Sequence, residues 1–230
     1  MTETEKKSLN LIEILKDINR PFPPEYLHIF SDITAADLAE VKKVWNQVPV
    51  LRKINLLQDL EAMMESDTLL SCDDFARFAL QDENPDVRTH AINLLWESED
   101  PQLTRIFGEI VSSDKNEIVR ANAASALGKF VLMGELEEIS KRYYDRTVDL
   151  LLDRYEKEDY EEVKQEILRA LAYCGKQEIL ELIKKAYDSD KKAWKIAALE
   201  AMGRSADHHW KDHVLANITN PDGDLQYEAI

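Results

Sequence analysis

Long apolar runs, cysteines and an amino-terminal leader are scarce or missing in this sequence. No stretch approaches the roughly 18 consecutive apolar residues of a membrane-spanning helix. The first twenty residues, MTETEKKSLNLIEILKDINR, lack the apolar core and cleavage site of a secretion signal. We therefore expect a cytoplasmic protein that does not contact a membrane. The only two cysteines, Cys72 and Cys174, are expected to be buried free thiols of a reducing compartment.

Basic residues are also in short supply. The chain has 29 Lys and Arg against 45 Asp and Glu, which gives a net charge of −16. Nucleic acids and anionic membranes are bound by clustered Lys and Arg side chains. The charge therefore predicts that no nucleic acid is bound, and it favours another protein with a basic face as the partner.

Catalytic and cofactor-binding motifs are missing as well. Neither GKF at 128–130 nor GKQ at 175–177 has the Gly-rich spacing of a phosphate-binding loop, which excludes a nucleotide site of that kind. We expect a protein that is not an enzyme and holds no cofactor. The segment DHHWKDH at 207–213 could present His209, Asp212 and His213 to a divalent ion. We prefer a simpler interpretation without a metal, in which Asp207 caps a helix and Trp210 packs inward.

What the sequence does contain is a repeated unit. ENPDVRTHAINLL at 83–95 is echoed by KNEIVRANAASAL at 115–127, with a shift of 32 residues at every position. The positions that correspond to Val87, in chain order, are Leu51, Val87, Val119, Val163, Trp194 and Leu225, at intervals of 36, 32, 44, 31 and 31 residues. Intervals of this size are typical of solenoids built from paired helices.

Apolar residues inside each unit follow the helical period. Val87, Ala91, Leu94 and Leu95 lie on one stripe of a helix, and Val163, Ile167, Ala170 and Leu171 repeat the same spacing. No alternating pattern is long enough to predict a strand. Pro49, Pro85 and Pro101 are placed where helices start, and Gly128, Gly175 and Gly203 are placed where helices could end. The pattern predicts an all-α fold of about six helix pairs.

Two units share an acid and an arginine at the same spacing. Asp82 precedes Arg88 by six residues, and Asp114 precedes Arg120 by six. An Asp in the turn can accept amide hydrogens at the start of the next helix, while the Arg can reach the acid of a neighbouring unit. We interpret these four residues as a structural ladder along the stack.

The segments DENPDVRTHAINLL, DKNEIVRANAASALG and DSDKKAWKIAALEAMG together resemble HEAT repeats. The resemblance is to the short bacterial type related to the HEAT-like repeats of phycobilisome lyases. It implies a right-handed α-α superhelix, a HEAT-like solenoid, over residues 33–230. Residues 1–32 are predicted to form a helical cap and a Pro-rich connector, in which the helix at 8–19 either covers the first unit or docks on a partner.

The resemblance further implies that the second helix of each unit lines a concave groove. Helical geometry then selects the positions that face the groove. They are Thr89, His90, Asn93, Asn122, Ser125, Gln165 and Arg169. This small, polar row suits hydrogen bonding to an extended peptide or a helix, and it does not resemble an apolar cofactor slot.

The interval of 44 residues indicates an insertion around 132–145. We predict a short added helix near 135–141, followed by a long outer helix to about 157. The region is rich in tyrosine and becomes strongly acidic between Asp153 and Glu162. It is a second candidate contact surface, although a solvated helix would show the same composition.

These features favour a non-catalytic scaffold or adaptor that binds a protein through the groove and the acidic insertion. Two alternatives remain open. One is a lyase accessory or chromophore-handling protein, which would need an apolar pocket. The other is a homo-oligomer formed through the last repeat, at 222–230, which starts in register and stops after about two turns.

Overall fold

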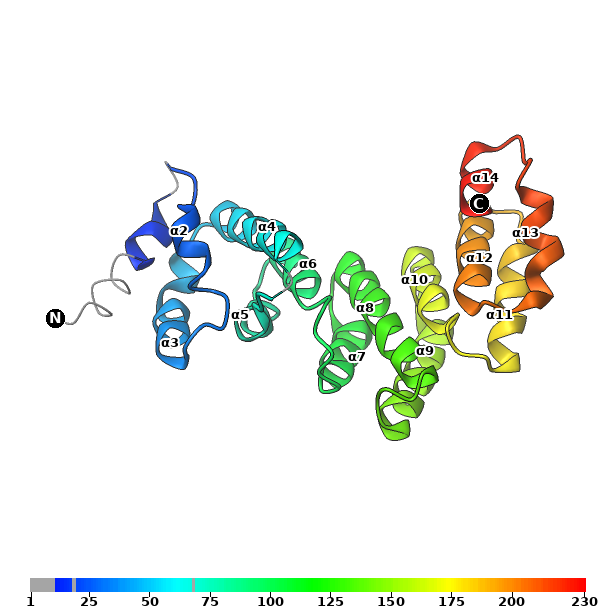
Figure 1. Cartoon of the computed structure of the whole chain (residues 1–230), viewed down its shortest axis with the longest axis horizontal. Coiled ribbons are helices and arrows are strands. Elements are labelled where there is room, and N and C mark those ends of the chain that lie inside the picture. The colour runs from blue at the N-terminus through cyan, green and yellow to red at the C-terminus, as the bar shows by residue number, and fades with distance from the viewer. Residues whose placement is uncertain (1–10, 18–19, 68) are drawn as a thin grey trace. The chain divides into compact units, whose positions relative to one another are not determined.

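The computed structural model describes residues 11–17, 20–67 and 69–230 (Figure 1). The secondary structure in these residues is helical, with no strand. The chain forms two compact units, residues 1–98 and 99–230, and each is described by itself. Of the predicted first helix, residues 11–16 are helical, with Leu11 and Leu15 buried, and the remainder lies outside the described residues or is not helical.

Proline or a capping residue lies at the start of four described helices of the first unit, as predicted for Pro49 and Pro85. Pro24 and Pro85 occupy the first position of a helix, Pro49 is an N-cap, and Thr34 and Asn84 accept hydrogen bonds from backbone N–H groups. The elements are α2 (Pro24–Leu27), α3 (Ala35–Val44), η1 (Trp45–Gln47), α4 (Val50–Ser66), α5 (Asp73–Ala79) and α6 (Pro85–Leu94). Helices α5 and α6 form a pair, and α6 packs on α4, the second helix of the preceding pair.

Aromatic rings fill the core of the first unit. Phe75 is fully buried, and its ring centroid lies 4.6 Å from that of Phe30 and 5.4 Å from that of Trp45. Edge-on and tilted contacts of this kind stabilise aromatic pairs beyond simple burial. Trp45 is therefore part of the core. Trp96 is not, because it is 57% exposed.

The second unit is a double layer of helices (Figure 1). Its first-helix layer contains α7 and α9, and α8, α10, α12 and α14 pack on one another in that order to form its second-helix layer. The elements are α7 (Leu103–Ser113), α8 (Glu117–Glu135), α9 (Lys141–Lys157), α10 (Glu161–Leu171), α11 (Gln177–Tyr187), α12 (Lys192–Ser205), η2 (His208–Trp210), α13 (Lys211–Asn217) and α14 (Gly223–Glu228).

The predicted apolar stripes are the interior of both units. Both four-residue stripes, the one that begins at Val87 and the one that begins at Val163, are buried. Small side chains let α8 and α10 approach closely: a Cβ added to Gly128 would lie 3.2 Å from the Cα of Ala170. The repeat period thus predicts the buried face of α6, α8 and α10. It is wrong for α4, where Leu51, the residue aligned with Val87, is 70% exposed.

The prediction of a short helix at 135–141 is wrong. Helix α8 continues to Glu135, and α9 begins at Lys141. The extra residues lengthen these two helices, and the chain turns at Glu137, which has a φ of 61°. Burial, together with hydrogen bonds to Cys174 and Glu135, raises the pKa of Tyr144 and keeps its hydroxyl protonated between α8 and the end of α10.

Glycine does not end these helices as expected. All six glycines are described, and none has a positive φ. Gly128 and Gly134 instead lie inside α8, where neighbouring groups leave no room for a side chain. Among the residues that the structure describes, a positive φ occurs at Asp32, Glu137 and Ala206. Burial raises the pKa of Cys72 to about 12, and both cysteines are free and buried.

Candidate functional site

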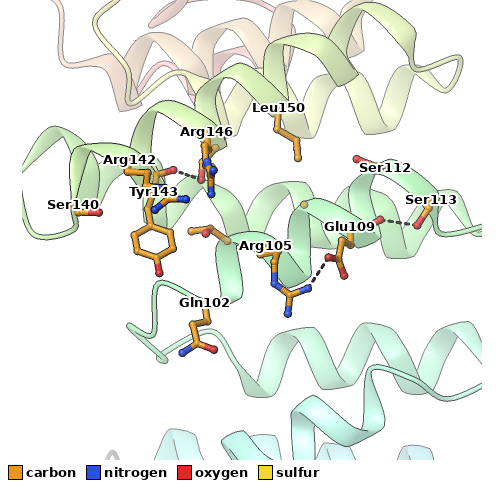
Figure 2. A pocket seen from close by; sticks show the side chains of 13 residues that line it. Gln102, Arg105, Glu109, Ser112, Ser113, Ser140, Arg142, Tyr143, Arg146 and Leu150 are labelled. Carbon is orange, nitrogen blue, oxygen red and sulfur yellow. Dashed lines mark hydrogen bonds and ion pairs between the residues drawn. The ribbon is translucent and has the colours of Figure 1, made fainter.

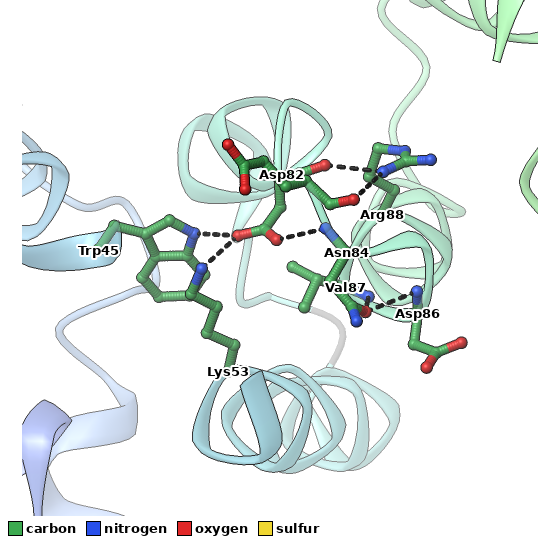
Figure 3. Close-up of polar contacts among 8 residues, drawn as sticks. Trp45, Lys53, Asp82, Asn84, Asp86, Val87 and Arg88 are labelled. Carbon is green, nitrogen blue, oxygen red and sulfur yellow. Dashed lines mark hydrogen bonds and ion pairs between the residues drawn. The ribbon is translucent and has the colours of Figure 1, made fainter. Parts of the chain in front are cut away.

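Asp82, in the turn between α5 and α6, links two successive helix pairs of the first unit. Its carboxylate accepts hydrogen bonds from Lys53 Nζ at 2.6 Å and from Trp45 Nε1 at 2.7 Å (Figure 3). Its other oxygen accepts one from the backbone N–H of Asn84 at 2.8 Å. Burial alone would raise the pKa of Asp82, but Lys53 and the other donors outweigh burial and lower it. The ionised carboxylate therefore ties α6 to the preceding pair.

We expect this link to weaken in acid. The pKa of Asp82 is lower in the folded chain than in the unfolded chain. Its stabilisation is therefore present above the unfolded pKa of about 3.9 and is lost as the pH falls through the folded pKa. Hydrogen exchange of the α6 amides, measured from about pH 6 to about pH 3, should show a steeper loss of protection in the wild type than in Asp82→Asn. Equal slopes in the two proteins would contradict this assignment.

Within its own repeat, each predicted arginine binds the backbone of the turn. Arg88 Nη1 donates to the carbonyl oxygens of Asp82 at 2.8 Å and Glu83 at 3.0 Å (Figure 3). Arg120 Nη1 donates to the carbonyl oxygen of Asp114 at 2.9 Å. These bonds satisfy carbonyl groups that the turn leaves without helical partners. The arginines thus fix the turn against the start of the second helix.

Arg120 also links its repeat to the next one. Its Nε and Nη2 atoms each donate to a carboxylate oxygen of Glu158 at 2.9 Å, and the two side chains are 10% and 4% exposed. Burial alone would raise the pKa of Glu158, but the hydrogen bonds from Arg120 and from two backbone N–H groups lower it overall. Glu158 precedes α10 as Asp82 precedes α6. The planar, two-bond geometry is the strongest form of such a pair.

Later repeats are joined by exposed ion pairs at the same place. Lys192, on α12, lies 2.7 Å from Asp222, which caps α14. Lys191, which precedes α12, pairs with Glu161 on α10. In that pair the charges are exchanged, because the acid is on the second helix and the base is in the turn. Exposed pairs contribute little stability one by one, so the buried links at Asp82 and Glu158 dominate.

Three residues of the predicted row, Thr89, His90 and Asn93, are on α6 in the first unit. Thr89 and His90 are half-buried, and Asn93 is exposed. His90 Nδ1 lies 2.8 Å from Glu61 Oε1 on α4, and its Nε2 lies 3.4 Å from the amide nitrogen of Gln58. The row therefore makes contacts between neighbouring second helices as well as facing solvent.

The other four residues, Asn122, Ser125, Gln165 and Arg169, are in the second unit. Asn122 and Ser125 are half-buried on α8, and the Asn122 amide donates to the carbonyl oxygen of Ile118, one turn earlier. Gln165 is only 7% exposed, which removes it from the surface row. Arg169 forms ion pairs with Glu166, at 2.9 Å, and with Glu200 on α12.

These side chains belong to a continuous strip of the second unit that we call the second-helix face. It consists of Ile118, Asn122, Ser125, Lys129 and Leu132 on α8, Glu166 and Arg169 on α10, and Glu200 on α12. Ile118 is 56% exposed and Leu132 is 36% exposed, so apolar side chains lie at both ends of the α8 part of this face, with half-buried Lys129 between Ser125 and Leu132. Arg204 donates to the carbonyl oxygen of Arg169 at 3.2 Å and further fixes α12 against α10.

The histidine segment is an aromatic cluster. Asp207 accepts a hydrogen bond from the backbone N–H of His209 at 2.8 Å and caps η2, and Trp210 is 2% exposed. The ring of His213 packs 5.5 Å from that of Trp210 and 5.2 Å from that of Tyr187. In the part of the chain that the structure describes, no group of three or more His, Cys, Asp or Glu side chains is arranged to hold a metal ion.

An open groove of about 770 Å³ between α7 and α9 was not predicted from the sequence. Gly108 and Thr147, which are buried, are among its lining residues, and so are Arg105, Arg142 and Arg146 (Figure 2). We call it the arginine groove. Arg105 pairs with Glu109 at 2.6 Å. Among the described residues neither Arg142 nor Arg146 forms an ion pair, although the chain as a whole is strongly acidic.

Two segments, residues 74–141 and 148–230, match the family model of HEAT repeats. Together they span well over half of the chain. The chain belongs to the HEAT-repeat family. No curated protein matches it closely enough to count as a relative.

The two matched segments contain the second-helix face. They contain only part of the arginine groove, because Arg142 and Arg146 lie at 142–147, between the two matches. HEAT repeats generally mediate protein–protein interactions, because stacked helix pairs present extended surfaces. Among the described residues no helix is both long enough and apolar enough to cross a membrane. Membership of this family thus indicates that the surfaces to consider are those that could bind a protein.

Proposed function

We propose that this HEAT-repeat protein is a non-catalytic adaptor that binds a partner protein along its second-helix face. The proposal rests mainly on the solvent side of α8. There the polar side chains of Asn122, Ser125 and Lys129 follow one another along the helix between two exposed apolar side chains, Ile118 and Leu132. Apolar anchors around hydrogen-bonding groups are what a docked peptide or helix requires.

The neighbouring helices define the chemistry of the partner. On α10 and α12 the charge of Arg169 is shared between Glu166 and Glu200. These three side chains together carry a net negative charge. Binding by this face therefore requires an apolar side chain to cover Ile118 or Leu132 and a basic side chain to meet the carboxylates.

The acidic segment at 153–162 extends this picture. Asp153, Glu156, Asp159 and Glu162 are exposed, whereas Glu158 is buried against Arg120 and is not accessible to a partner. The exposed acids steer a basic partner towards the protein, and this contribution should fall as salt is added. The acidic segment is accordingly an aid to encounter, with the second-helix face as the site of docking.

Affinity capture with matched surface variants tests the proposal. In Asn122→Arg/Ser125→Arg, two long cationic side chains cover the centre of the face. Gln177→Arg/Thr219→Arg places the same charges on exposed positions elsewhere in the second unit. We expect mass spectrometry to find a protein that the wild type and the Gln177/Thr219 variant retain and that the Asn122/Ser125 variant loses, with a loss of at least about tenfold.

Retention of every partner by the Asn122/Ser125 variant, with an unchanged helical spectrum, would refute docking on this face. The same preparations separate the alternatives. Visible absorption of the purified wild type would indicate a bound chromophore. A dimer mass in light scattering would indicate self-association, for which the exposed Leu215 and Tyr227 near the last repeat provide apolar surface.

A further inference from the structure

We propose that the arginine groove between α7 and α9 binds an acidic peptide segment of a partner protein. The groove lies in the first-helix layer, and the second-helix face lies in the other layer of the same unit. The two sites use different side chains. A result that refutes binding at one site therefore leaves the proposal for the other site untouched.

The shape of the groove comes from small residues on α7. A Cβ added to Gly108 would lie 2.9 Å from the Cδ1 atom of Leu150 on α9, so the two helices touch at this point. Thr104, Ser112 and Thr147 keep the walls short on either side of the contact.

The charge of the groove opposes that of the whole protein. The chain carries a net charge of −16, yet three arginines line the groove, and Glu109 is the one carboxylate among its described lining residues. Arg142 and Arg146 are both exposed and remain available to bind a ligand. Guanidinium groups bind carboxylates through two parallel hydrogen bonds. The groove therefore selects an acidic ligand.

The spacing of the arginines favours an extended peptide. Arg142 and Arg146 are one helical turn apart on α9, a rise of about 6 Å. Alternate side chains of an extended strand are about 6.6–6.8 Å apart and point to the same side. Acidic residues at every second position would thus place their carboxylates opposite the two guanidinium groups. The Tyr143 hydroxyl and the Gln102 amide, which line the same groove, can bind the peptide backbone (Figure 2).

Other anionic ligands fit less well. The open, two-helix walls do not enclose a small molecule, which is normally buried over most of its surface. Nucleic acid would find three arginines in place of a long basic track. An acidic peptide can pair with the arginines of the groove through a few carboxylates, and its extended backbone can lie along the groove.

Fluorescence anisotropy of the full chain with a labelled peptide tests this inference. The peptide has Glu at alternate positions among Gly and Ser, and its control has Gln in place of Glu. We expect the Glu peptide to bind at least about tenfold more tightly than the Gln peptide, and salt to weaken its binding. Arg142→Glu/Arg146→Glu should weaken binding by at least about tenfold, and Ser112→Trp, which fills the groove without a charge change, should also abolish it.

A matched control separates the groove from the general field of the protein. Lys184→Glu/Lys185→Glu, at exposed positions of α11, changes the net charge as much as the arginine double variant does. It should keep the affinity within about twofold. Equal binding of the Gln peptide, no binding of either peptide, or equal loss in both double variants would overturn the proposal. Displacement of the peptide by an equal concentration of single-stranded oligonucleotide would assign the groove to nucleic acid instead.

Discussion

Replacing Arg120 by alanine should destabilise the second unit by about 3–5 kcal/mol, the usual cost of removing one partner of a buried ion pair. The variant leaves the Glu158 carboxylate, whose side chain is 4% exposed, without its cation. Two backbone N–H groups, those of Asp159 and Tyr160, would still donate to it. Urea unfolding followed by circular dichroism measures the effect, and hydrogen exchange of α8 and α10 locates it in the second unit.

The second unit contains a control of the same chemistry. Arg105 and Glu109 form an arginine–glutamate pair at 2.6 Å, but their side chains are 69% and 64% exposed. Arg105→Ala should therefore cost no more than about 0.5 kcal/mol. Adding Glu158→Gln to Arg120→Ala should recover part of the lost stability, because no charge then remains buried. Equal losses in Arg120→Ala and Arg105→Ala would show that the buried link does not hold the repeats together.

Gly134→Ala should destabilise the second unit by about 1–3 kcal/mol, although alanine is the better helix former. A Cβ at this position would lie 2.1 Å from the Cδ2 atom of Tyr144, 2.6 Å from its Cγ and 2.7 Å from its Cβ. The last of these is next to the backbone and cannot swing away. The ring would have to move, and with it the hydrogen bonds from Tyr144 to Cys174 and Glu135.

Gly203 provides the comparison for this substitution. It lies in the last turns of α12, and nothing lies within 4 Å of a Cβ added there. Gly203→Ala should stabilise the chain by about 0.5–1 kcal/mol through helix propensity alone. Thermal unfolding of the two variants should therefore shift in opposite directions. A shift in the same direction for both would mean that Tyr144 moves aside at little cost.

Much of the fold could be predicted because the same apolar pattern recurs in several repeats. The 3.6-residue stripe identifies the buried faces of α6, α8 and α10, and Pro49 and Pro85 mark the starts of α4 and α6. The alignment was one residue out of register on α4, where Leu51 is exposed. The end of α8 was not predictable in the same way. Gly134 resembles a helix breaker in the sequence, and its real role depends on Tyr144, which comes from the following helix.

The candidate sites were predictable only in part. Helical spacing places Asn122 and Ser125 on the exposed side of α8, but it places Gln165 there too, and that side chain is buried. The arginine groove escaped prediction because Arg105 and Arg146 are about forty residues apart, on first helices, whereas the repeat was aligned on second helices. Nothing in either segment alone indicates that the two arginines share one groove.

The links between successive repeats also bear on how an array of this kind can grow by gene duplication. Lys53 and Arg120 are bases near the start of a second helix, and each meets an acid in the next turn. A duplicated repeat that kept the acid in its turn and the base on its second helix could form these links with the repeats before and after it, without further substitutions. The exchanged pair of Glu161 and Lys191 breaks this rule. A repeat inserted directly after α10 would place the acid of its turn next to Glu161, and the two carboxylates would repel each other. Duplication is therefore compatible with the ion-pair pattern on either side of the junction between α10 and α12, and not at that junction.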